Sequence, residues 1–230
     1  MSIDGVPVVT EAFPTTVRLV TTARLRAAVL VQLVDNEDEL ELLAEIEGAT
    51  STRLIAQEKG ISGLAANELV YDVAHAHFIN ASFAYAKPQQ PNRFNGADRG
   101  AWYAALDVET CLDEVGYHLS NALADAGDYH AIVEYVEMFC SLAGAFLDLR
   151  QQPDHPSLDP DKARAYPIGN ALADSARANG LNGIIYPSVR HEGGTCIVAL
   201  RPAAVQSVRQ GAVYRMIWNG DPTPMIEGPL

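Results

Sequence analysis

The order of apolar and polar residues predicts helices in the first part of the chain. Between residues 17 and 65 apolar residues recur at helical spacing, opposite a face rich in glutamates. Residues 1–16 contain two prolines and predict an irregular lead-in. We therefore expect an N-terminal helical extension over residues 1–66, with a main domain over residues 67–230. The alternative for this extension is an interaction arm.

The first half of the main domain combines strand and helix signals. Aromatic and β-branched residues with polar interruptions predict extended structure between Glu68 and Tyr85, and a short apolar strand over residues 101–106. Asp107 is a suitable N-cap, and it predicts a helix from Val108 to about Ala126. Residues 130–150 predict a strand that gives way to a short helix.

The second half begins with a loop. Three prolines within residues 151–160 predict an exposed loop, and a helix follows from about Ala165 to Asn179 before Gly180. Further strands are predicted at Ile184–Tyr186, Thr195–Leu200 and Tyr214–Trp218. Strands and helices do not alternate regularly, so the predicted class is α+β, with short strands and flanking helices.

Composition narrows the class of protein further. The chain has 230 residues, of which 48% are apolar and 20% charged, a balance typical of a globular domain. Its formal net charge of −13 makes nucleic acid a poor first candidate for a ligand, because an acidic surface repels the phosphate backbone. No apolar run is long enough for a transmembrane helix, and the N-terminus lacks a signal-peptide pattern, so we expect a cytoplasmic protein.

Familiar motifs for nucleotide binding, hydrolysis and metal binding do not occur in the sequence. It has no glycine-rich dinucleotide or phosphate loop, no nucleophile elbow and no zinc-protease motif. Its three cysteines are far apart, and we expect reduced, mostly buried thiols. His75 and His77 would share one face of a strand, but no further ligand follows at metal spacing, so we expect no metal.

Four residues remain as candidates for chemistry, and each also has an ordinary structural explanation. Arg93, in a glycine-containing loop, could hold phosphate oxygens or serve as a surface or capping residue. Tyr103 could stack on a heterocycle or fill the core. Glu114 lies on a largely apolar helix, where a buried carboxylate needs a role or a counter-charge, although it could equally be solvated. Ser188, at a strand end, could reach a ligand or form a turn.

Four blocks in this order resemble the RES-domain family, which is named for its arginine, glutamate and serine. They are Arg93-Phe94-Asn95, Trp102-Tyr103-Ala104-Ala105, Thr110-Cys111-Leu112-Asp113-Glu114 and Tyr186-Pro187-Ser188, the last followed by Gly193-Gly194. Ten residues lead from Arg93 to Tyr103, and eleven from Tyr103 to Glu114. The resemblance covers about residues 70–205 and rests on the ordered set rather than on any single block.

This resemblance implies a fold and an activity. Members of the family are similar to ADP-ribosyltransferases in fold, and they are toxins of bacterial toxin–antitoxin pairs that consume NAD+. Some cleave NAD+ with water or phosphate as the acceptor, and at least one group transfers ADP-ribose to a protein. Their antitoxin carries a helix-turn-helix part and blocks the NAD+ pocket. NAD+ is therefore expected as the substrate, with no cofactor, no metal, and a toxin–antitoxin hetero-oligomer as the assembly.

The resemblance also implies roles for individual residues. Glu114 would stabilise an oxocarbenium-like ribose, Arg93 would hold the diphosphate, and Tyr103 would stack on or orient the nicotinamide. Ser188 and Asn95 would contribute to substrate binding. Many members have a further arginine about twenty residues before the Arg-Phe-Asn block, which this chain lacks, and His75, His77 or Lys87 are the candidates to replace it.

Two other functions remain open from the sequence alone. One is an ADP-ribosyltransferase that modifies a host protein through the same pocket and differs only in the acceptor. The other is a non-enzymatic interaction module, in which the arginine loop and Glu114 form a structural ion pair.

Overall fold

The computed structural model describes residues 2–23, 64–84 and 91–230. The predicted helical pattern between residues 24 and 63, and Lys87, lie outside the described residues. The helices are α4 (Ala76–Ala84), α5 (Val108–Ala126) and α6 (Lys162–Ala178), with short 3₁₀ turns at Ala66–Glu68, Pro156–Leu158 and Pro202–Ala204. The strands are β1 (Ser2–Ile3), β2 (Val6–Thr21), β3 (Trp102–Ala105), β4 (His130–Asp148), β5 (Gly183–Pro187), β6 (Thr195–Ala199), β7 (Val205–Asn219) and β8 (Met225–Glu227).

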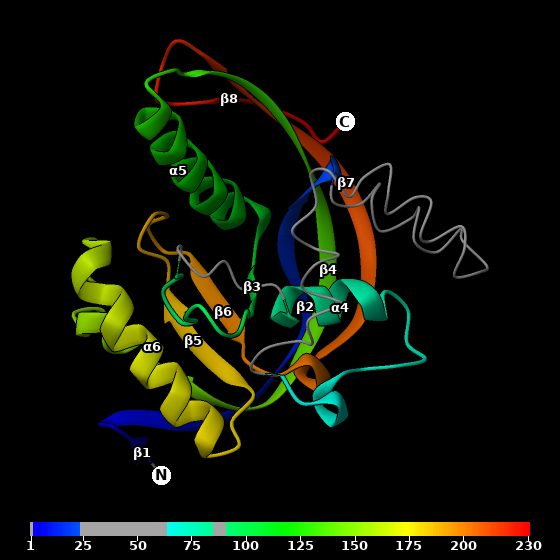
Figure 1. Ribbon diagram of the computed structural model, residues 1–230, viewed down its shortest axis with the longest axis vertical. Coiled ribbons are helices and arrows are strands. Elements are labelled where there is room, and N and C mark those ends of the chain that lie inside the picture. The colour runs from blue at the N-terminus through cyan, green and yellow to red at the C-terminus, as the bar shows by residue number, and fades with distance from the viewer. Residues whose placement is uncertain (1, 24–63, 85–90) are drawn as a thin grey trace.

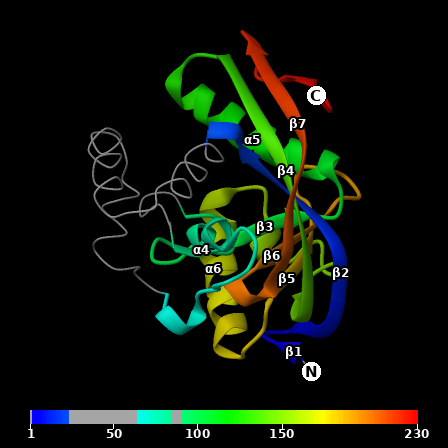
Figure 2. The ribbon, with the colours of Figure 1, turned by 90° about the vertical axis from the view of Figure 1, so that its right-hand side faces the viewer.

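The described strands form one eight-stranded sheet in the order β1-β2-β3-β6-β5-β4-β7-β8. Strand β2 pairs with β4 as well as with β3, so β2, β3, β6, β5 and β4 close into a ring of paired strands. The pairing of β4 with β5 is parallel, and the others are antiparallel. The long strands β2, β4 and β7 run side by side along the molecule (Figures 1 and 2). The α+β class predicted from the sequence is confirmed, but β2, β4 and β7, with 16, 19 and 15 residues, are not the short strands that were predicted.

Alternating side chains divide the core into two clusters on opposite faces of the short strands. In β3, Trp102 belongs to one cluster and Tyr103 packs on the other, because successive residues of a strand point to opposite faces. Helix α4 contributes to the Trp102 cluster, whereas α5 and α6 contribute to the cluster on the Tyr103 side. Figure 1 shows α5 and α6 together on one side of β3, with α4 on the other. This division decides which residues can share a site with Tyr103.

Strand β2 occupies most of the region predicted to be an irregular lead-in and continues through residues 17–21, where helix was predicted, so both predictions are wrong there. The strand pairs with β4 at 12 positions, with a bulge between Phe13 and Thr16 that contains Pro14. Proline has no N–H to donate, and a bulge is a place where the hydrogen-bond ladder tolerates it. Although β2 precedes residue 67, at which we divide the chain, it belongs to the same sheet as the strands that follow.

Two other predicted elements also differ from the structure. The segment Glu68–Tyr85 contains helix α4 rather than a strand, because Phe78, Ile79 and Phe83 lie on one helical face and bury against the Trp102 cluster. His75 and His77 therefore do not share a strand face. Strand β4 continues through residues 130–148 with no helix, since it is paired with β2 on one side and β7 on the other.

The locally determined elements agree with the sequence. Helix α5 begins after Asp107, whose carboxylate accepts the backbone N–H of Thr110 at 2.7 Å. Helix α6 and strands β3, β5, β6 and β7 lie where predicted, although α6 starts at Lys162 and β7 is longer than expected. The three cysteines are free and buried, as predicted. Burial raises the pKa of Cys111 to about 12.

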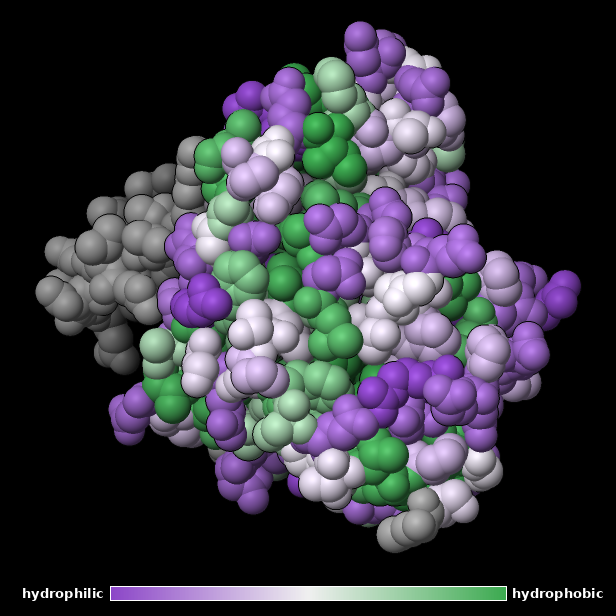
Figure 3. Space-filling model, turned by 180° about the vertical axis from the view of Figure 1, so that it is seen from behind, coloured by the Kyte–Doolittle hydropathy of each residue, from purple (hydrophilic) through white to green (hydrophobic). Residues whose placement is uncertain are grey.

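One face of the molecule carries apolar side chains at its surface. Seen from behind, polar side chains flank a central strip of apolar ones (Figure 3). Apolar atoms contribute more than half of most protein surfaces, so the strip needs no partner to explain it. In the part of the chain that the structure describes, no helix is long and apolar enough to cross a membrane.

Gly169 allows helix α6 to lie directly against the loop that carries Arg93. A Cβ atom at this position would lie 2.1 Å from the Arg93 carbonyl oxygen and 3.3 Å from the Phe94 ring. We expect Gly169→Ala to lower the free energy of unfolding by about 2 to 4 kcal/mol, because the backbone contact must open. Urea denaturation measures this loss.

Gly116→Ala is the matched control for Gly169→Ala. Gly116 also lies inside a buried helix face, but its new Cβ would meet the flexible end of the Met216 side chain at 3.0 Å. The gain in helix propensity, about 1 kcal/mol, should offset the small adjustment of Met216. Equal stability of Gly169→Ala and the wild type would contradict the close packing of α6 on the loop.

Candidate functional site

Arg93 is buried in its loop and holds part of a second loop in place. It is 9% exposed, and its Nη1 donates to the carbonyl oxygens of Ser157 and, at 3.2 Å, of Asp159. Its guanidinium carbon lies 5.7 Å from the centroid of the Tyr166 ring. Nε and Nη2 of Arg93 have no hydrogen-bond partner among the described residues and remain available to a ligand.

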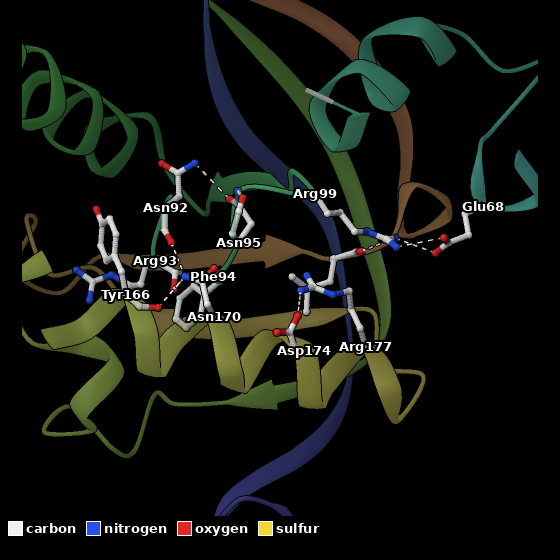
Figure 4. A network of polar contacts seen from close by, with 12 residues as sticks. Glu68, Asn92, Arg93, Phe94, Asn95, Arg99, Tyr166, Asn170, Asp174 and Arg177 are labelled. Carbon is white, nitrogen blue, oxygen red and sulfur yellow. Dashed lines mark hydrogen bonds and ion pairs between the residues drawn. The ribbon is translucent and has the colours of Figure 1, made fainter. Parts of the chain in front are cut away.

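The loop that accepts these hydrogen bonds, within residues 151–160, was predicted to be exposed, and this prediction is wrong for its middle. Ser157 and Leu158 are buried in the 3₁₀ turn that precedes α6. From α6, the Asn170 side-chain amide donates to the carbonyl oxygens of Asn92, Arg93 and Tyr166, at 2.8, 3.3 and 2.6 Å. Figure 4 shows Arg93, Tyr166 and Asn170 gathered over α6. Helix α6 thus fixes the backbone of the Arg93 loop.

Tyr103 joins the same loop to strand β3. Its hydroxyl accepts the backbone N–H of Phe94 at 3.0 Å and donates to Asn95 Oδ1 at 2.9 Å. Burial raises the pKa of Tyr103, so the phenol stays neutral and keeps its proton for this bond. Asn95 is itself 3% exposed, and its amide nitrogen donates to the Gly96 carbonyl oxygen. Asn95 therefore supports the loop, and its polar atoms are engaged inside the protein.

Glu114 and Ser188 contact each other directly across two elements. The Ser188 hydroxyl donates to Glu114 Oε1 at 2.7 Å, which joins helix α5 to the end of β5. Ser188 Oγ also accepts the backbone N–H groups of Arg190 and His191, at 3.1 and 3.0 Å, and this directs its proton toward the carboxylate. Glu114 Oε2 has no hydrogen-bond partner within the described part of the chain. One oxygen is held and the other is left for a ligand.

A second contact anchors the turn after Ser188 on the same helix. His191 Nδ1 lies 2.7 Å from a carboxylate oxygen of Asp113, the neighbour of Glu114. The hydrogen bond to Asp113 raises the pKa of His191, which favours the charged imidazolium. Gly194 packs on Thr110, since a Cβ there would lie 2.5 Å from the Thr110 hydroxyl oxygen. The turn is therefore fixed against the first half of α5.

Tyr186 occupies the centre of these residues. Its ring packs edge-to-face on Phe94 with the centroids 4.9 Å apart. Burial raises the pKa of Tyr186; the nearby charge of Glu114 and the Tyr103 hydroxyl act in the same direction, and Arg93 opposes them. The structure thus brings Arg93, Tyr103 and Glu114 around one buried ring. Ser188, which follows Glu114 by 74 residues in the sequence, joins them through its hydrogen bond to Glu114.

Other candidates are not part of this group. His77 belongs to α4, which packs on the Trp102 face of β3, opposite to Tyr103. Arg99, in the same loop as Arg93, forms a bidentate ion pair with Glu68 at 2.8 and 3.1 Å (Figure 4). It also donates to the Leu200 carbonyl oxygen. Among the residues that the structure describes, no group of three or more potential ligands could hold a metal ion.

Four residues near Glu114 are not among those selected from the sequence. They are Tyr117, Lys162, Tyr166 and Arg190. Tyr117 follows Glu114 by three positions on a helix, and Arg190 follows Ser188 by two, so both lie within reach of the predicted site. Helical spacing from Glu114 is the signal that finds Tyr117. Lys162 and Tyr166 depend on how α6 packs, which no local pattern gives.

Tyr103→Phe tests the link between β3 and the Arg93 loop. The substitution removes the acceptor for the Phe94 N–H and the donor to Asn95 Oδ1. We expect the free energy of unfolding to fall by about 1 to 2 kcal/mol, measured by urea denaturation. Tyr71→Phe is the control, because the Tyr71 side chain is 62% exposed and should tolerate the change. Equal stability of the two variants would contradict a structural role for the Tyr103 hydroxyl.

Comparisons with known proteins match the chain to a family model and to individual proteins, two of which follow. A family model described as "RES domain" matches residues 69–219. "Uncharacterized protein y4oC" of Sinorhizobium fredii is 26% identical over 188 residues, which cover 80% of this chain and 75% of that protein. Among solved structures, the chain is similar to one chain of the MbcT–MbcA toxin–antitoxin complex of M. tuberculosis. The match has 15% identity and a TM-score of 0.37, and it covers 54% of this chain and 74% of the other.

Proposed function

Because the chain belongs to the RES-domain family, we propose that it cleaves the N-glycosidic bond between nicotinamide and ribose in NAD+. The observation that carries this proposal is the 2.7 Å hydrogen bond from Ser188 to Glu114, which holds one carboxylate oxygen and leaves the other for a ligand. When the glycosidic bond breaks, nicotinamide leaves with the electron pair and the ribose C1′ becomes oxocarbenium-like. A fixed carboxylate beside that carbon stabilises the positive charge.

The other residues of the site position the substrate in this proposal. Nε and Nη2 of Arg93 hold oxygens of the diphosphate, while Nη1 stays on the loop carbonyls. The ring of Tyr103 lies against the nicotinamide, and its hydroxyl keeps the Arg93 loop on β3. Ser188 acts as a positioning residue for Glu114, because its proton is directed to the carboxylate.

The reaction is completed by an acceptor at C1′. Water adds through its oxygen, loses a proton to solvent and yields ADP-ribose; a phosphate oxygen adds in the same way and yields a phosphorylated ADP-ribose. NAD+ is the substrate in both cases, and the proposed chemistry assigns no cofactor. The proposed core is similar to that of ADP-ribosyltransferases, as the family resemblance implies.

The family resemblance also suggests a cellular role. We propose that the protein is the toxin of a bacterial toxin–antitoxin pair, neutralised by a helix-turn-helix antitoxin that covers the NAD+ pocket. Its net charge of −13 suits a toxin that leaves DNA contact to its partner. Induced expression of the full chain should arrest bacterial growth and deplete NAD+. Unchanged growth together with normal NAD+ levels would contradict this role.

The activity is tested with the purified full chain and NAD+. Chromatography measures the release of nicotinamide and identifies the ribose product in the presence and absence of phosphate. Nicotinamide release supports the proposal, and the product identifies the acceptor. Release that occurs only in a cell extract, with ADP-ribose found on proteins by mass spectrometry, assigns a protein acceptor instead. No release in either setting contradicts the proposal.

A further inference from the structure

Three cations near Glu114 lack a carboxylate partner, although the protein is strongly acidic. Arg93, Lys162 and Arg190 form no ion pair with any carboxylate in the described part of the chain. By contrast, Arg99, Arg150, Arg164, Arg177 and Arg215 are all ion-paired. Arg201 and Arg209 also form no ion pair among the described residues, but they contact the Arg177 carbonyl oxygen and the Phe139 ring, away from Glu114. What sets Arg93, Lys162 and Arg190 apart is that they gather beside the candidate site of a chain with a net charge of −13.

Lys162 and Arg190 both lie against the ring of Tyr117. The guanidinium carbon of Arg190 lies 3.5 Å from the ring centroid, and Lys162 Nζ lies 5.2 Å from it. Arg190 Nη2 also donates to the Pro160 carbonyl oxygen at 3.3 Å, which holds the side chain over the ring. The pair therefore joins three elements: α5, the start of α6 and the turn after β5.

Two like charges on one ring repel each other, and the ring compensates them only in part. A cation–π contact contributes about 0.5 to 2 kcal/mol, whereas an anion that contacts both cations would form two charge-assisted pairs. A phosphate group suits such a pair, since Arg offers a planar set of donors and Lys a compact charge. All three side chains of the cluster are only partly buried, so a ligand can reach them.

The pair lies beside the proposed catalytic carboxylate. Tyr117 follows Glu114 by three positions on α5, and residues at that spacing are neighbours on a helix face. The backbone N–H of Arg190 donates to Ser188 Oγ, the same oxygen whose proton is bonded to Glu114. Arg93 and Arg190 both act on Tyr166, where they oppose the rise in its pKa that burial causes. A ligand held by Glu114 at a sugar would place a neighbouring phosphate near the cations.

We propose that Lys162 and Arg190, held on Tyr117, form an oxyanion site that takes a phosphate group next to the sugar bound at Glu114. This assignment deepens the proposed function and rests on it where the phosphate is taken to be the diphosphate of NAD+. The same chemistry would also accept free inorganic phosphate as the second substrate, and the experiment separates these sources.

Binding of inorganic pyrophosphate to the full chain, measured by isothermal titration calorimetry, tests the site without turnover. We expect the Lys162→Gln, Arg190→Gln double variant to bind at least tenfold more weakly, because two charge-assisted contacts are lost. Arg209→Gln is the matched control, since Arg209 lies over the Phe139 ring at 4.3 Å and has no role in the site. Its affinity should equal that of the wild type. The single variant Arg190→Lys keeps a positive charge and should bind pyrophosphate more tightly than the double variant does.

Kinetics with two substrates then identify the source of the phosphate. If the site holds the diphosphate, the double variant loses at least tenfold in kcat/KM for NAD+ but little for nicotinamide riboside, which has no phosphate. If the site holds free phosphate, kcat/KM for NAD+ in water is unchanged and only the phosphate-dependent product falls. Either result supports an oxyanion site.

Two results overturn the proposal whatever the activity of the chain. The proposal fails if the wild type does not bind pyrophosphate. It also fails if the double variant unfolds at the same midpoint as the wild type and binds pyrophosphate equally tightly. Failure of the proposed function gives a different result from failure of the anion site. A wild type that does not consume NAD+, yet binds pyrophosphate through Lys162 and Arg190, would retain the anion site and lose only its assignment to NAD+.

Discussion

Glu114→Gln is expected to reduce kcat for NAD+ cleavage by about 100- to 1000-fold while KM changes little. Removal of one preorganised group that stabilises charge in a transition state costs factors of this size, about 2.7 to 4 kcal/mol. Glutamine keeps an oxygen that can accept the proton of Ser188, so the contact between α5 and the end of β5 survives. Initial rates of nicotinamide release at several NAD+ concentrations separate kcat from KM.

Asp113→Asn is the matched control for this prediction. Asp113 is the adjacent carboxylate on α5, and it is also bonded to the turn after β5, through His191 at 2.7 Å. Its side chain is 47% exposed, and it has no place in the proposed chemistry. Its kcat should stay within about threefold of the wild type, because an exposed ion pair contributes little. A Glu114→Gln enzyme as active as Asp113→Asn would remove Glu114 from the mechanism.

The fold was predictable from the sequence where neighbouring residues determine it. The start of helix α5 follows from Asp107, whose carboxylate accepts the backbone N–H of Thr110, three residues later. Strand β2 could not be found in this way, because Thr16 bonds to Cys140 across a sequence separation of 124 residues. Strand β4 has the same origin, since pairing on both edges keeps it extended where its sequence suggests a helix. Long-range pairing outweighed local propensity in both strands.

The sequence selects four residues that the fold brings together, but it gives neither their contacts nor the residues beside them. The order and spacing of the four blocks selected Arg93, Tyr103, Glu114 and Ser188. The sequence does not indicate that the side-chain amide of Asn95 forms hydrogen bonds to Gly96 and Tyr103. Nor does it indicate that the carbonyl oxygen of Ser157 accepts a hydrogen bond from Arg93. Lys162 enters the site through the packing of α6, which depends on Gly169 lying against the Arg93 backbone.

Arg93→Ala is expected to affect both stability and substrate binding. The substitution leaves the carbonyl oxygens of Ser157 and Asp159 without their donor and empties a buried site, so the free energy of unfolding should fall by about 2 to 4 kcal/mol. Arg93→Lys keeps the charge but loses the planar set of donors. We expect it to fold with a smaller loss and to raise KM for NAD+ by about tenfold or more. Urea denaturation and steady-state kinetics measure the two effects.

Arg99→Lys separates a supporting arginine from Arg93, which is proposed to bind substrate as well. Arg93 and Arg99 lie in one loop and are 9% and 8% exposed, but Arg99 uses its guanidinium on Glu68. Arg99→Lys should therefore lower stability by about 1 to 3 kcal/mol and leave KM for NAD+ unchanged. The two lysine variants should then differ in KM for NAD+, because Nε and Nη2 of Arg93 are the donors proposed to hold the diphosphate. An unchanged KM in Arg93→Lys would confine Arg93 to holding the loop and would shift phosphate binding to Lys162 and Arg190.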